Sequence, residues 1–153
     1  MPETVFGLPV HPLLVHATVV TLPLAASLLI ASVLVPRLRV WAGPLPLLFA
    51  LASLALVPLT TMSGENLEKA IGTSQAINDH AALGEMVIWW TIGLVVVAAI
   101  SYAIRLRGRS PATAVTVAVA VLGVVVGVGT IVQVALTGHS GAQAVWDGVL
   151  PEE

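Results

Sequence analysis

Four histidines are the side chains of this sequence best suited to hold a cofactor or a metal ion, because imidazole binds zinc, copper and haem iron. They are His11, His16, His80 and His139. The chain contains no cysteine, which excludes disulfides, iron–sulfur clusters, covalently attached c-type haem and thiolate zinc sites. The imidazoles can act together only if the fold brings them to one side of the molecule.

The spacing of the first two histidines separates their roles. They lie five residues apart in the stretch GLPVHPLLVHATVV, residues 7–20. Two histidines that bind one ion from a single helix are four residues apart, whereas five residues correspond to about 140° around a helix axis. We therefore expect each ring to face a different neighbouring helix. His16 is favoured as a ligand because it lies deeper in the apolar run by about 7.5 Å, whereas His11, beside Pro12, is better explained as a residue that caps the helix.

Composition indicates an integral membrane protein. Hydrophobic residues make up 58% of the chain and charged residues 9%, against about 45–50% and 25% in soluble domains. Four apolar stretches exceed the roughly 20 residues that a helix needs to cross a bilayer, and a backbone in lipid must satisfy its own hydrogen bonds. We predict one domain, residues 1–153, folded as an all-α, antiparallel four-helix bundle. Helices are expected over about residues 11–36, 41–62, 80–105 and 111–137, with an outer loop over residues 63–79.

The distribution of charge predicts the orientation of this bundle. Lysine is confined to one position, Lys69, in the expected outer loop, and five arginines occupy the two short links between helices: Arg37, Arg39, Arg105, Arg107 and Arg109. By the positive-inside rule these links face the cytoplasm and both termini lie outside. No basic residue precedes the first apolar run, so a cleaved signal peptide is not expected.

Under this topology the four histidines lie in the outer half of the bundle, next to other polar side chains. Glu85 lies within the third helix, where a carboxylate is costly and is functional or paired by default; it could also reach the surface or hydrogen-bond Gln133. Gln133 and Thr137, with Thr130, form a polar stripe on the fourth helix. We predict a polar pocket in which Glu85, Gln133 and Thr137 support the histidines.

Three positions of the fourth helix have no side chain, because they are glycines: Gly123, Gly127 and Gly129. They allow another helix or a flat ligand to approach closely, and helix packing is the commoner reason for such a pattern. No internal repeat is evident, although the first two and the last two helices form two similar hairpins.

The sequence resembles the DUF2231 family of small bacterial four-helix membrane proteins. The opening stretch HPLLVH is similar to the family's signature of His-Pro, two apolar residues and Val-His, and the tail TGHSGAQAVWDG is similar to its closing motif. His80, in NDHAALGEM, also matches. The chain departs where members often carry Phe-Pro after the second histidine, at Ala17 and Thr18, and a further histidine near Asp147. Some members look fused to Rieske-type redox domains, so the resemblance implies electron transfer, b-type haem and a place in the bacterial cytoplasmic membrane.

Three functions remain open. The first is a membrane b-type cytochrome, with His16 and either His80 or His139 as axial ligands, and with His11 and the remaining one of these two in a second site. It would carry electrons for a redox protein or quinone rather than act as a stand-alone enzyme. The second is a zinc- or copper-binding membrane protein. The third is a non-catalytic subunit or scaffold whose histidines stabilise the outer loops. A homo-oligomer is compatible with all three, and nucleic acid is not expected because the chain has no basic patch.

Overall fold

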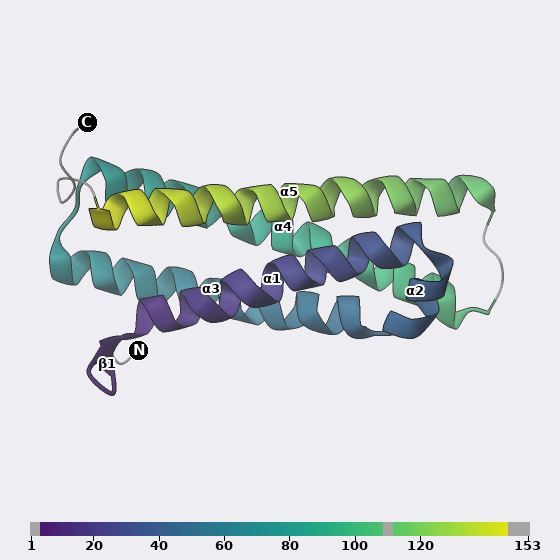
Figure 1. The fold of residues 1–153 in the computed structure, drawn as a ribbon, viewed down its shortest axis with the longest axis horizontal. Coiled ribbons are helices and arrows are strands. Elements are labelled where there is room, and N and C mark those ends of the chain that lie inside the picture. Colours follow the sequence, from purple (N-terminus) through teal and green to yellow (C-terminus); the bar gives the residue numbers. More distant parts are fainter. Residues whose placement is uncertain (1–3, 109–111, 147–153) are drawn as a thin grey trace.

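The structure, a computed structural model, describes residues 4–108 and 112–146 as a bundle of long helices (Figure 1). A two-residue antiparallel ribbon precedes the first helix. The elements in chain order are β1 (Thr4–Val5), β2 (Leu8–Pro9), α1 (Val10–Leu34), α2 (Pro36–Ala42), α3 (Leu45–Ile71), α4 (Gln75–Leu106) and α5 (Thr113–Trp146).

Among the described residues, four helices are long and apolar enough to cross a membrane: α1, α3, α4 and α5. Their outer faces carry exposed apolar side chains, such as Trp89 with 72% of its surface exposed. The interior is filled by a short column of buried residues that includes Leu22, Leu29 and Leu94. An apolar exterior around a tightly packed interior is what lipid solvation favours, so the predicted all-α membrane fold is confirmed at this level.

The helices follow one another around the bundle in a closed order. α1 packs against α3 and α5, α4 packs against the same two helices, and α1 and α4 therefore face each other across the bundle. The amino ends of α1 and α4 lie beside the carboxyl ends of α3 and α5, while α2 lies at the opposite end (Figure 1). We call these the histidine end, which holds His11 and His80, and the arginine end, which holds the described arginines of α2 and of the carboxyl end of α4.

The connection at the histidine end is much shorter than the outer loop predicted over residues 63–79. α3 continues to Ile71 and α4 begins at Gln75, because the stretch ENLEKA has good helix formers and no residue that breaks a helix. Gly72, with φ +89°, ends α3, and its N–H donates to the carbonyl of Glu68. The hydroxyl of Ser74 then caps α4 by accepting from the N–H of Ile77.

Two further boundaries differ from the prediction. The first inter-helix link contains a separate helix, α2, which begins at Pro36 as its fixed φ favours. α5 does not end near residue 137 but continues to Trp146, because Ser140 and Gly141 pack against His80 and extend the contact between α5 and α4. Sequence periodicity alone does not reveal this tertiary contact.

Helix packing accounts for the glycines of α5. A Cβ built on Gly127 would lie 2.6 Å from Cγ1 of Ile30, and one built on Gly123 would lie 3.0 Å from Cγ2 of Val33. A Cβ on Gly129 would overlap the ring of Trp90. Gly123 and Gly127 therefore let α1 approach α5, and Gly129 makes room for an aromatic ring from α4.

Gly127→Ala should destabilise the bundle by about 1–3 kcal/mol, since the added methyl group overpacks the contact between α1 and α5. Thermal unfolding in detergent, followed by circular dichroism, measures the change. Gly138→Ala is the matched control on the same helix, because nothing lies within 4 Å of a Cβ built there and alanine favours the helix. An equal loss in both variants would contradict the packing explanation.

Candidate functional site

The first half of the site is an imidazole of α1 anchored to α3. Nδ1 of His11 lies 3.1 Å from the carbonyl oxygen of Thr60 and 3.2 Å from Oγ of Ser63. The hydroxyl of Ser63 donates to the same carbonyl at 2.7 Å. The ring is half-buried, and α1 is joined to α3 at this point.

This network assigns the tautomer of the His11 ring. The carbonyl of Thr60 can only accept, and the hydrogen of Ser63 is already directed to that carbonyl. Nδ1 must therefore carry the proton and donate to the carbonyl and the hydroxyl oxygen. Nε2 keeps its lone pair, which is the state in which an imidazole binds a metal.

The second half of the site repeats this arrangement on α4 and α5. Nδ1 of His80 lies 3.1 Å from the carbonyl oxygen of Thr137 and 3.1 Å from Oγ of Ser140. The hydroxyl of Ser140 donates to the carbonyl of Thr137 at 2.9 Å. The same reasoning places the proton on Nδ1 of His80 and leaves its Nε2 free.

A glycine completes each half. A Cβ on Gly64 would lie 3.0 Å from Cε1 of His11, and a Cβ on Gly141 would lie 3.0 Å from Cε1 of His80. The carboxyl ends of α3 and α5 thus share the pattern Thr-x-x-Ser-Gly, as TTMSG over residues 60–64 and TGHSG over residues 137–141. The two hairpins make the same contacts here, and this short shared pattern is the sequence signal by which that equivalence could have been predicted.

The two anchored rings meet across the bundle. The ring centres of His11 and His80 are 6.4 Å apart, and the ring planes form an angle of 73°. Each ring is held through Nδ1 by its own hairpin, so the nitrogens that remain for a shared ligand are the two Nε2 atoms. The arrangement is a pair of imidazoles with fixed orientation and an available lone pair on each.

Two residues predicted to belong to the site lie on the outside of the bundle instead. His16 is exposed and its Nδ1 lies 2.6 Å from the carbonyl of Pro12 in its own helix. Glu85 is also exposed. Each lies five residues after a paired histidine, His11 or His80, and five residues turn a side chain to another face of the helix. The depth of His16 suggested a ligand, but its direction is outward.

The remaining histidine predictions concern His139 and the capping role of His11. His139 is exposed on α5, and no ring contact or hydrogen bond joins it or His16 to another histidine in the described part of the chain. His11 does not cap its helix: Pro9 occupies the N-cap position, with no side-chain hydrogen bond. The structure therefore brings together His11 and His80, a combination that the sequence prediction allowed only for a second site.

Comparison with known proteins places the chain in a family. The family model of DUF2231, described as a predicted membrane protein, matches residues 7–151. The chain belongs to the DUF2231 family. No curated protein and no solved structure matches it.

In this DUF2231 chain two residues of the polar stripe of α5 form hydrogen bonds to α4 close to His80. The buried amide of Gln133 donates to the carbonyl of Leu83 at 2.8 Å, and the hydroxyl of Thr137 donates to the same carbonyl at 3.3 Å. These bonds join α5 to α4 one turn below the ring. Gln133 uses its amide on the backbone and not on Glu85, so the stripe is a structural support.

The donor set of the site is limited to imidazole. Over residues 4–108 and 112–146, no group of three or more histidine, cysteine, aspartate or glutamate side chains is placed to hold a metal ion. Any ligand of His11 and His80 must therefore bring further donors of its own.

Ser63→Ala and Ser140→Ala should destabilise the protein to a similar extent, by about 1 kcal/mol each, because each removes a hydroxyl that bonds both a carbonyl and an imidazole. Thermal or denaturant unfolding in detergent provides the comparison. Ser27→Ala, at an exposed position of α1, is the control and should have little effect. A loss in only one of the two variants would argue against equivalent halves.

Proposed function

We propose that this protein is a membrane b-type cytochrome that binds haem between His11 and His80 and transfers single electrons. The observation that carries the proposal is the pair of imidazoles, anchored alike and facing each other across the bundle. In this proposal the bundle is antiparallel and lies in the bacterial cytoplasmic membrane. The arginine end faces the cytoplasm by the positive-inside rule, and both termini lie on the outer side.

The separation of the rings supports a shared metal ion. A bond between a metal and an imidazole nitrogen is about 2.0–2.1 Å long, so an ion bonded to both rings would hold their centres about 6 Å apart. The observed separation of ring centres is 6.4 Å. This separation of ring centres is compatible with one ion bound between the two Nε2 atoms.

The number of ligands favours haem over a free zinc ion. Structural zinc takes four protein ligands and catalytic zinc takes three, whereas the described residues bring together two imidazoles and no group of three metal-binding side chains. Haem iron needs from the protein only one or two axial ligands. When bound, haem supplies reversible one-electron chemistry.

The surrounding residues have defined roles toward such a ligand. The carbonyl and hydroxyl acceptors at Nδ1 hold each ring in one orientation and make its Nε2 more basic, as outer partners of metal-binding histidines do. Gly64 and Gly141 leave room for the rings against α3 and α5. Lys69, in the last turn of α3, is a cation available to a propionate. A redox protein or a quinone would exchange electrons at this end.

Haem content of purified variants tests the proposal. With haem supplied during expression, the protein should show a Soret band and a reduced-minus-oxidised difference spectrum, and His11→Ala or His80→Ala should lose most of the bound haem. His16→Ala and His139→Ala are the matched controls and should keep it, because both residues are exposed and neither contacts the pair in the described part of the chain. The ring planes form an angle of 73°. If both rings bind the haem iron at this angle, the electron paramagnetic resonance spectrum of the oxidised protein should show the highly anisotropic low-spin signal typical of nearly perpendicular imidazoles.

Other outcomes point to the alternatives. A protein without a Soret band contradicts the cytochrome, and bound zinc or copper that His11→Ala and His80→Ala both lose would indicate a metal-binding protein. If the protein binds neither haem nor a metal ion, and if His11→Ala and His80→Ala are less stable than the wild type, the protein is a scaffold in which the imidazoles only join the hairpins. Loss of haem from His16→Ala but not from His11→Ala would assign the site to a different pair.

A further inference from the structure

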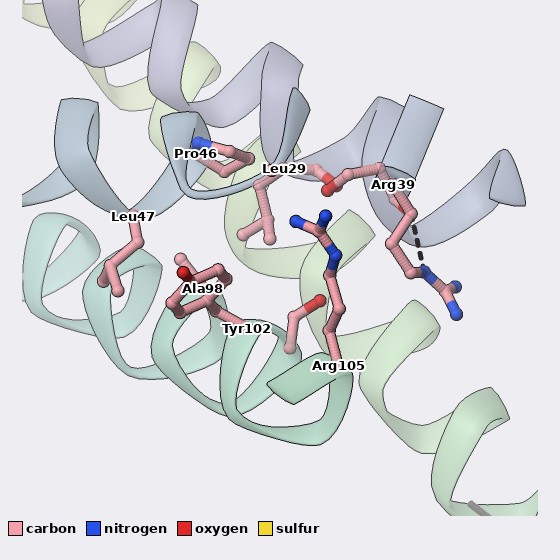
Figure 2. Close-up of a pocket in the computed structure, with 10 residues that line it drawn as sticks. Leu29, Arg39, Pro46, Leu47, Ala98, Tyr102 and Arg105 are labelled. Atoms are coloured by element: carbon pink, nitrogen blue, oxygen red, sulfur yellow. Dashed lines mark hydrogen bonds between the residues drawn. The ribbon is translucent and has the colours of Figure 1, made fainter. Parts of the chain in front are cut away.

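A pocket at the arginine end combines apolar walls with unneutralised positive charge (Figure 2). It lies where α1, α3 and α4 meet the turn between α2 and α3. Leu29, Leu47 and Ala98 form its apolar part, and Ser101, Tyr102 and Arg105 line the side contributed by α4. The enclosed space is about the size of one water molecule, so a larger ligand would place one atom inside and the rest at the mouth.

Arg105 is the side chain positioned to meet such a ligand. It reaches from the last turn of α4 to α2, where its Nη2 donates to the carbonyl of Val40 at 3.4 Å. Its Nη1 lies against Gly43, where an added Cβ would approach it to 3.3 Å. A guanidinium group has five N–H donors, and the single hydrogen bond to Val40 leaves most of them available.

The hydroxyl groups beside Arg105 are available as well. No hydrogen bond within the described chain uses the hydroxyl of Ser101 or of Tyr102, and both residues are half-buried. Arg39, the second cation of the pocket, has a different use: its Nε and Nη2 donate to the carbonyls of Ser32 and Val33 at the end of α1.

The positive charge of the pocket has no counter-charge in the described part of the chain. The described acidic side chains, Glu65, Glu68, Asp79 and Glu85, all lie in the half of the bundle toward the histidine end. A guanidinium beside two hydroxyls matches the oxygens of a phosphate group, which accepts several charge-assisted hydrogen bonds at once. Basic pockets between membrane helices are typical sites for anionic lipid headgroups.

We propose that this pocket binds a phosphate group, and that the phosphate belongs to an anionic phospholipid. Exposed apolar residues surround the arginine end, including Val40, Trp41 and Leu106 at 68%, 74% and 69% exposure. They offer contact to acyl chains beside the headgroup, which a soluble phosphate would not use. The site is independent of the proposed haem site, at the opposite end of the bundle.

Native mass spectrometry of the purified full chain tests the proposal, with phosphatidylglycerol and phosphatidylcholine of identical acyl chains as probes. The wild type should retain phosphatidylglycerol in preference to phosphatidylcholine, and Arg105→Gln should weaken that retention by about tenfold, the equivalent of one charge-assisted hydrogen bond. Tyr102→Phe, which removes only a hydroxyl, should weaken it by a smaller factor. Circular dichroism verifies that the variants are folded.

Arg107→Gln is the matched control, because it removes the same charge at an exposed position of the same end, outside the pocket. It should leave the preference for phosphatidylglycerol nearly unchanged. Equal weakening by Arg105→Gln and Arg107→Gln, or no preference between the lipids, overturns the proposal in favour of a general surface charge. If inorganic phosphate alone raises the unfolding temperature of the wild type but not of Arg105→Gln, and neither lipid is preferred, the phosphate is soluble and the lipid assignment is overturned.

Discussion

Each half of the histidine site depends on one hydrogen bond, from an imidazole Nδ1–H to a backbone carbonyl of the neighbouring helix. The carbonyl of Thr60 or Thr137 accepts from the ring and also from the hydroxyl of the serine three residues later. In a lipid environment an imidazole N–H with no partner is costly, so this bond fixes the height at which α1 packs on α3 and α4 on α5. It also determines which ring nitrogen remains free.

The imidazole pair exists only in the complete bundle. His11 is anchored to α3 and His80 to α5, so each hairpin supplies one ring and neither hairpin can form the pair alone. The rings meet because α1 and α4 face each other across the bundle. That in turn requires α1 to approach α5 closely, which Gly123 and Gly127 permit in the middle of the membrane-spanning segments. Packing far from the rings therefore contributes to the distance between them.

The sequence predicts the class of the fold better than the direction of its side chains. Apolar runs identify four long helices and place His11 and His80 at the same end, because those properties depend on composition and order alone. Helix ends were harder: α5 passes Gly138 because Ser140 and Gly141 contact His80, a tertiary interaction. The choice of His16 as a ligand stays a prediction. Its side chain is exposed, and the inward face of a lipid-exposed helix cannot be read from hydrophobic periodicity when both faces are apolar.

Charge separates the bundle into two ends with different chemistry. At the arginine end, Arg39 satisfies the carbonyls that end α1, and Arg105 lies in a pocket without a described carboxylate nearby. Between the ends, the interior is an apolar column around Leu22 and Leu29. His16 lies farther along α1 than His11, and it is exposed. Among the described residues, no second pair of imidazoles therefore extends the proposed electron site toward the arginine end. Under the proposed function, electrons would enter and leave at the histidine end, and the redox partner would have to approach that face or the adjoining leaflet.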